Sequence, residues 1–250
     1  GAMPDWDVSN VTDMSSAFIS KNSFNGDIIS WDVSSVTNMA FMFYYAKAFN
    51  QDLSSWDVSN VINMRDMFGS AYAFNQDIGT WDVSNVTTME EMFFLASAFN
   101  QDISAWDVSS VTNLSTFLRG TSISVANYDT LLTSWSALTL QQGVTFSNST
   151  LQYCTAGDAR QSIIDTYGWV IEDAGLNCTA AGLEDEHLFA ISIYPNPTSN
   201  TLFISGNETP IAVAIYNVLG KEVLSIKNTN NINVKALPSG VYVIRISDGV

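Results

Sequence analysis

The sequence is poor in charged residues, and above all in basic ones. Only 14% of its residues are charged, whereas about 25% is typical of soluble domains. Nine lysines and arginines stand against 25 acidic residues, which leaves a formal net charge of -16. Phosphate backbones and anionic lipids repel such a chain, so nucleic acid is excluded as a partner. No apolar run reaches the roughly 18 residues of a membrane-spanning helix.

Histidine and cysteine are also scarce. The chain has one histidine, His187, and two cysteines, Cys154 and Cys178. Neither cysteine belongs to a C-x-x-C pair and the histidine lies beyond both, so the spacing of a zinc site is missing. We therefore expect no metal and no cofactor. In an exported protein the two cysteines would pair, which stabilises by roughly 3 kcal/mol for a loop of this length. Two free thiols are the alternative.

What the sequence does contain is a repeat of 25 residues. The tetrapeptide Trp-Asp-Val-Ser begins at Trp6, Trp31, Trp56, Trp81 and Trp106. Within each copy a valine follows the tryptophan after five residues, methionine or leucine after eight, and phenylalanine or leucine after twelve. With 46% hydrophobic residues, the copies can bury one continuous core when they stack. The repeat predicts a solenoid over residues 4–120.

The apolar spacing changes within each copy. Leu53, Trp56, Val58 and Val61 follow the L-x-x-L-x-L spacing of a leucine-rich repeat, whose centre is a short strand. From Val61 onward the apolar residues recur every three or four positions, which predicts one face of a short helix. The expected fold is therefore an α/β leucine-rich-repeat solenoid with a strand and a helix in each copy.

These repeats resemble the bacterial BspA-like leucine-rich-repeat surface proteins, in the form W-D-V-S-x-V-T-x-M. Residues 121–178, with Asn127-Tyr128-Asp129 and Tyr153-Cys154, resemble the α/β cap that often closes such arrays. The resemblance implies an exported surface protein, and adhesion to matrix proteins or to other cells. Residues 1–3, Gly-Ala-Met, look like the remnant of a removed tag and are left out of the fold.

A second domain follows a change of composition. Residues 179–188 contain the acidic run Glu184-Asp185-Glu186 and are expected to form a linker. Beyond them, short alternating segments are separated by turn signals such as Pro195-Asn196-Pro197 and Pro238-Ser239-Gly240. Several short strands in about 65 residues predict a small, Ig-like all-β sandwich over residues 189–250.

Three motifs in this second domain resemble the type A C-terminal sorting domain of the type IX secretion system. The motifs are Tyr194-Pro195-Asn196-Pro197, Tyr216-Asn217-Val218-Leu219-Gly220-Lys221 and Leu237-Pro238-Ser239-Gly240-Val241-Tyr242. The resemblance implies export to the outer surface of a Gram-negative bacterium, with the secretion machinery as a partner of residues 189–250. Such domains usually end with one more strand and a basic tail, so we expect the C-terminal end to be trimmed.

Two sets of repeated polar residues are expected to be structural. One contains the aspartates that follow the tryptophans, Asp7, Asp32, Asp57, Asp82 and Asp107, and the other contains Asn50, Asn75 and Asn100. Asparagine and aspartate side chains bond to nearby backbone amides, so both sets are predicted to cap turns. Stacked copies place the aspartates about 5 Å apart. Calcium binding is the alternative for this set.

Positions that differ between copies indicate where a ligand would bind. The candidate binding residues are Phe41, Tyr44, Tyr45, Tyr72 and Phe94. Exposed aromatic side chains stack on sugar rings or anchor a protein partner, although packing beneath a loop would also explain them.

No set of converging catalytic groups is visible, because His187 lies in the acidic linker. We therefore predict a non-catalytic surface protein that binds a surface protein, a matrix protein or a glycan. The alternatives are a spacer with no ligand, and a carbohydrate-binding component of a polysaccharide-utilising surface system.

Overall fold

The computed structural model describes residues 3–178, 192–194, 198, 200–205, 211–218, 220–227 and 231–248. The chain divides into two compact units, residues 1–182 and 183–250. The predicted linker at 179–188, with His187, lies outside the described residues, as do residues 1 and 2 of the expected tag remnant.

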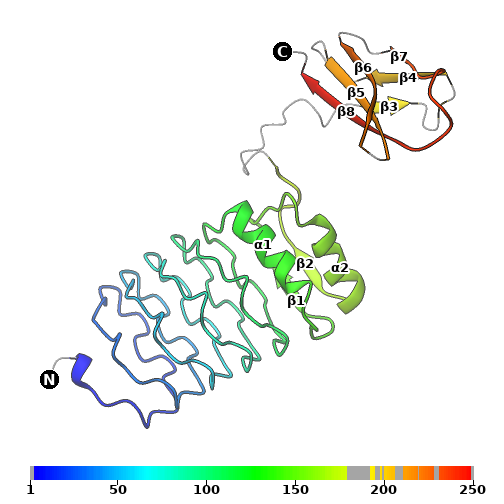
Figure 1. Ribbon diagram of the computed structural model, residues 1–250. Helices are drawn as coiled ribbons and strands as arrows, with labels where there is room; N and C mark the ends of the chain where they lie inside the picture. Colours follow the sequence, from blue (N-terminus) through cyan, green and yellow to red (C-terminus); the bar gives the residue numbers. More distant parts are fainter. Residues whose placement is uncertain are drawn as a thin grey trace. The chain divides into compact units, whose positions relative to one another are not determined.

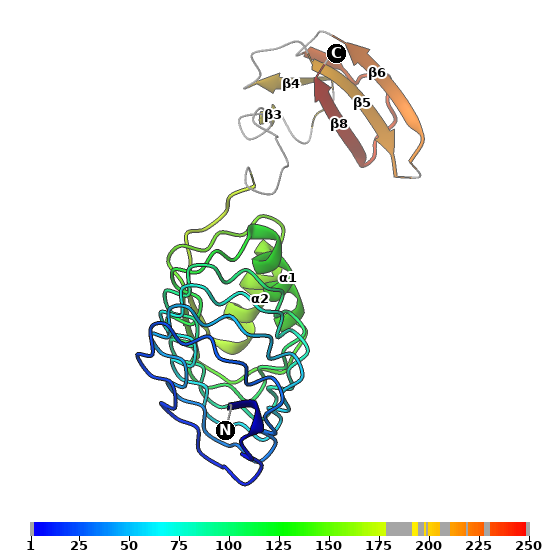
Figure 2. The same cartoon turned by 90° about the vertical axis from the view of Figure 1, so that its left-hand side faces the viewer.

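In the first unit, the repeats form coils that stack on one another (Figure 1), and in Figure 2 the same coils lie one behind another. The chain enters the stack through a short 3-10 helix, η1 (Met3–Asp5). Residues 6–120 form neither an α-helix nor a strand. Parallel bridges between single residues link successive coils at Asp13, Asn38, Asn63, Thr88 and Asn113.

Each coil is a series of tight turns. The N–H of Trp56 donates to the carbonyl of Leu53, and that of Val61 donates to Val58. Between residues 64 and 71, alternate N–H groups point along the stack. Of the others, those of Met67, Gly69 and Ala71 close turns three residues back, and that of Arg65 donates to Oδ1 of Asn63. The N–H groups of Met64, Asp66, Phe68 and Ser70 donate to the carbonyls of Thr88, Glu90, Met92 and Phe94 in the next coil.

The predicted strand and helix of each repeat are therefore wrong. Val61, Met64 and Met67 are all buried, as they would be on the inner face of a helix, but the Met64 N–H donates to Thr88 in the next coil and only Met67 closes a turn within the set, on Met64. An α-helix needs backbone hydrogen bonds between residues four apart. A segment as short as this one does not form a stable helix by itself. The coils instead place two residues per copy in the left-handed region, such as Asp66 at φ 52° and Ser70 at φ 57°. These interrupt a right-handed helix.

The core of the stack is an aromatic ladder, and the predicted 25-residue spacing of the tryptophans is confirmed. Phe68 is fully buried, with ring centroids 5.5 Å from Phe43 and 5.6 Å from Phe93 in the neighbouring coils. It also stacks on Phe74 of its own coil at 3.9 Å. The indole N–H of Trp81 donates to the Leu53 carbonyl of the previous coil at 3.0 Å. Stacked rings and this bond join each coil to the next.

The last coil is closed by the cap. The cap contains α1 (Val125–Trp135), β1 (Thr145–Ser147), α2 (Gly157–Tyr167) and β2 (Val170–Glu172), with β1 parallel to β2. In the earlier coils, the N–H at the position of Leu118 donates to a backbone carbonyl of the next coil. The Leu118 N–H donates instead to Oδ1 of buried Asn148 in the cap, at 2.7 Å. The Thr116 N–H donates to the Ser147 hydroxyl at 3.3 Å. Cys154 and Cys178 form the predicted disulfide within this region.

The described residues of the second unit form two three-stranded antiparallel sheets, which confirms the prediction of a small β-sheet domain. One sheet has the order β3–β4–β7 and the other β6–β5–β8. The strands are β3 (Ser192–Tyr194), β4 (Thr201–Ser205), β5 (Ile211–Asn217), β6 (Glu222–Lys227), β7 (Asn231–Asn233) and β8 (Tyr242–Asp248). Leu202, Val213 and Ile232, from both sheets, share one buried cluster.

Candidate functional site

The aspartates that follow the tryptophans lie exposed and bond to their own turns. Oδ1 of Asp57 accepts the Ser59 N–H at 3.0 Å and the Ser59 hydroxyl at 2.6 Å. Asp7, Asp32 and Asp82 bind the serine two residues on in the same way, and these bonds hold the pKa of each carboxyl below its usual value. In the described part of the chain, no three His, Cys, Asp or Glu side chains are arranged to hold a metal ion.

This geometry leads to a prediction for the aspartate column. Asp57→Ala removes both acceptor contacts to Ser59 and should cost about 1 kcal/mol, as the loss of a cap does. Thermal unfolding followed by tryptophan fluorescence measures this loss. Chelator added to the unaltered protein should leave the melting temperature unchanged, because the serine bonds do not need an ion. A large fall in melting temperature with EDTA that calcium restores would contradict the capping role.

The asparagines form a ladder along the stack. Oδ1 of Asn50 accepts the N–H of Asn75 at 2.9 Å, and Oδ1 of Asn75 accepts the N–H of Asn100 at 2.8 Å. Asn100 extends the ladder into the cap by accepting the Ser124 N–H at 2.8 Å. Each side-chain oxygen thus accepts a backbone N–H from the segment stacked on it. These asparagines therefore have a structural role.

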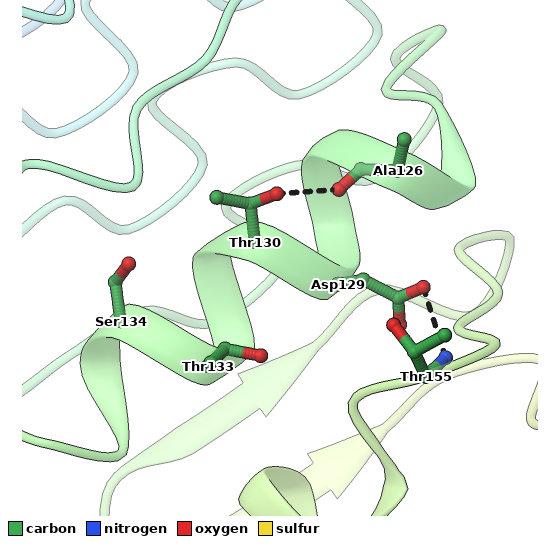
Figure 3. Close-up of a pocket in the computed structure, with 6 residues that line it drawn as sticks. All are labelled: Ala126, Asp129, Thr130, Thr133, Ser134 and Thr155. Carbon is green, nitrogen blue, oxygen red and sulfur yellow. Dashed lines mark hydrogen bonds between the residues drawn. The ribbon is translucent and has the colours of Figure 1, made fainter.

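The cap contains a hollow of about 390 Å³, shown in Figure 3. Its lining residues are Ala126, Asp129, Thr130, Thr133, Ser134 and Thr155. The Asp129 carboxylate accepts N–H bonds from Cys154, Thr155 and Ala156, just before α2 begins. The Thr130 hydroxyl donates to the Ala126 carbonyl at 2.9 Å. Because these polar groups already bind the fold, the hollow is a weak candidate for a ligand site.

A stronger candidate lies where the copies differ, on the second and third coils. We call Phe41, Tyr44, Tyr45 and Tyr72 the aromatic patch. Tyr44 meets Phe41 edge-on, with ring centroids 5.8 Å apart at 80°, and meets Tyr45 at 5.0 Å and 62°. Tyr72 is 38% exposed, and the other three rings are half-buried. Among the described ring contacts, none joins the half-buried Phe94 to these four rings.

Two basic side chains lie against the aromatic patch. The Lys47 ammonium lies 5.5 Å from the centroid of Tyr45 and 5.6 Å from that of Tyr72. The Arg65 guanidinium lies 5.6 Å from the centroid of Phe41. All three distances suit cation–π attraction. The aromatic patch therefore already binds cations within the chain.

Asp66 lies beside this patch and was not predicted from the sequence. The residue is only 2% exposed, and its Oδ2 lies 3.4 Å from Nε of Arg65, which also reaches Glu90 at 3.3 Å. Its Oδ1 is buried without a hydrogen-bond partner among the described residues. Burial and the charge of Glu91 raise the pKa of this carboxyl to about 6, against the opposing effect of Arg65.

Gly69 allows Tyr44 and Asp66 to pack closely together. A Cβ added to Gly69 would lie 2.8 Å from Cδ2 of Tyr44 and 3.0 Å from Oδ1 of Asp66. Burial and then the charge of Asp66 raise the pKa of Tyr44 above its usual value. The signal for Asp66 in the sequence is the column Ser16, Phe41, Asp66, Glu91 and Thr116, whose members differ in every copy.

Taken together, the stacked coils and the separate sheets define a repeat protein that carries a small β-sheet domain. The family described as "Mycoplasma protein of unknown function, DUF285" matches residues 1–83 and 52–152, and the chain belongs to this family. Residues 192–250 match the family described as "Secretion system C-terminal sorting domain". No curated protein and no solved structure matches the chain.

The sorting domain determines the destination of the protein. It directs export by the type IX secretion system to the outer surface of Gram-negative bacteria, and it implies contact with that secretion machinery. Among the described residues, no helix has the length and apolar character to cross a membrane.

Proposed function

We propose that the repeat region is a non-catalytic binding module that recognises a protein partner through the aromatic patch. The observation that carries this proposal is the backbone of Phe41 and Tyr45, both at φ 59°. A left-handed conformation costs a residue with a side chain roughly 1–2 kcal/mol, and glycine or asparagine avoids most of this cost. Bulky aromatic side chains at these two positions therefore work against local stability, which supports a role in binding.

The same observation argues against a spacer without a ligand. At the position of Tyr45, the other coils carry Ser20, Ser70, Leu95 and Gly120. A region that only spaces other domains gains nothing from a tyrosine in this conformation. The resemblance to BspA-like surface proteins also supports adhesion.

Ring geometry favours a protein over a glycan. Sugars stack on flat, open aromatic faces, whereas Tyr44 meets both of its neighbours edge-on. Three rings of the patch also have a cation over them: Lys47 lies over Tyr45 and Tyr72, and Arg65 lies over Phe41. Tyrosine and arginine together are typical of the residues that dominate binding energy at protein interfaces.

Tyr45→Asn tests the proposed function. Asparagine suits a positive φ, so the variant should be at least as stable as the unaltered protein, while binding to a protein partner should weaken by about 10-fold or more. The full chain is first screened against purified matrix proteins and a glycan array. The affinity for each ligand that binds is then measured by titration with the unaltered protein and with the variant.

Leu95→Asn provides the matched control. Leu95 has φ 58° and is 39% exposed on the fourth coil, so this variant has the same backbone relief and the same loss of an apolar side chain. Binding should change little in the control. Equal binding by Tyr45→Asn and the unaltered protein would refute the proposed role of the patch, and binding to glycans alone would favour the carbohydrate alternative.

A further inference from the structure

The buried carboxylate of Asp66 is not explained by the fold. Its Oδ1 is shielded from solvent and has no partner in the described part of the chain. A buried carboxylate oxygen without a hydrogen bond is costly, and native structures rarely keep one without a reason. The backbone does not require aspartate either, since asparagine is equally suited to φ 52°.

The surroundings of this carboxylate already select positive charge. Arg65 lies between Asp66, Glu90 and the Phe41 ring. Arg65 reaches only Oδ2 of Asp66, so Oδ1 remains for another donor. Residues 4–120 contain fourteen acidic and four basic side chains, so the whole repeat region attracts a basic partner.

We propose that Asp66 is the receptor for a lysine or arginine side chain from a basic segment of the protein partner. The incoming ammonium or guanidinium group donates to Oδ1 of Asp66, and the ring of Tyr44 lies beside its aliphatic stem. This inference rests on the proposed function and specifies the chemistry of the partner. A cation meets both demands of the site, because it supplies the missing donor and neutralises the buried charge.

Other ligands fit the site less well. A sugar hydroxyl would supply a donor but would leave the charge of Asp66 uncompensated. A divalent metal ion needs several oxygen ligands, and among the described residues no group of three acidic side chains is placed to provide them.

The test is titration of the full chain with hexa-arginine peptide at pH 7.5, with the neutral hexa-citrulline peptide as a reference. Asp66→Asn should weaken hexa-arginine binding by about 10-fold or more, as expected for loss of a charge-assisted bond. Asp82→Asn is the matched control, because it removes the same charge from an exposed aspartate that binds Ser84. The control should change binding by less than about 2-fold.

A second variant tests access to Oδ1 of Asp66 while leaving the charge of the carboxylate in place. Gly69→Ala places a methyl group 3.0 Å from Oδ1 of Asp66 and 2.8 Å from the Tyr44 ring. This methyl group should hinder access to the oxygen and weaken hexa-arginine binding as well. Thermal unfolding of all three variants confirms that the coils are intact.

The outcomes separate this inference from the proposed function. Equal weakening by Asp66→Asn and Asp82→Asn, or equal binding of the two peptides, would overturn the inference, since general charge attraction would then explain the result. If a protein from the screen loses affinity with Tyr45→Asn but not with Asp66→Asn, the proposed function stands and the inference fails. Loss with both variants supports both.

Discussion

Phe68→Ala is expected to lower the free energy of unfolding of the repeat region by about 4 kcal/mol, within the range for buried phenylalanine. Phe68 lies in the third of the five coils and is fully buried. Its ring stacks on Phe43 and Phe93 along the ladder and on Phe74 within its own coil. Alanine would leave a cavity that stiff neighbouring coils cannot fill, and it would remove stacking on both sides at once.

Tryptophan fluorescence during chemical unfolding measures this loss. All seven tryptophans lie between residues 6 and 169, so the signal reports on the first unit alone. Phe94→Ala is the control, because Phe94 is half-buried and stands outside the ladder; it should cost about 1 kcal/mol. A cost below about 2 kcal/mol for Phe68→Ala would mean that the ladder contributes little to cohesion between coils.

The core of the repeat region was predictable from the sequence, and its backbone was not. Repetition alone identifies Trp56, Val61, Met64 and Phe68 as core positions, because stacked copies bury equivalent side chains. The spacing of three and four residues does not distinguish a helix from successive turns, since both can bury Val61, Met64 and Phe68. The choice depends on bonds between coils, such as Phe68 N–H to the Met92 carbonyl, which no single copy reveals.

The candidate site was predictable only in part. Differences between copies drew attention to Tyr44, Tyr45 and Tyr72, because such differences are visible in one sequence. Asp66 was missed because one acidic residue between Arg65 and Met67 looks like a solvated side chain. Its importance comes from its burial and from the close approach of both Asp66 and Tyr44 to Gly69, which depend on stacking.

Asp66→Asn is expected to stabilise the repeat region at neutral pH, by up to about 3 kcal/mol. The pKa of Asp66 is about 6 in the folded protein and 3.8 for the free carboxyl, mainly because of burial and the charge of Glu91. Glu90 also raises this pKa, and Arg65 lowers it by bonding and by charge. Between these two pKa values the folded protein keeps a proton that the unfolded chain has lost. The contribution of Asp66 to stability is therefore complete below pH 3.8, and it is lost as the pH rises through about 6.

Unfolding of the unaltered protein and of Asp66→Asn, measured from pH 3.5 to 7.5, separates this effect from other titrations. The hydrogen-bonded aspartates have lowered pKa values, so their contribution is lost as the pH falls below about 4, in both proteins alike. The difference in stability between the two proteins should therefore grow between about pH 4 and 6 and stay constant above that. Asp82→Asn should show no change in this window, because the pKa of Asp82 is shifted downward.

A constant difference across the whole range would mean that Asp66 is solvated in the folded protein. A destabilised Asp66→Asn at pH 7.5 would mean that its carboxylate serves the fold, which would remove the structural basis for a cation site at this position.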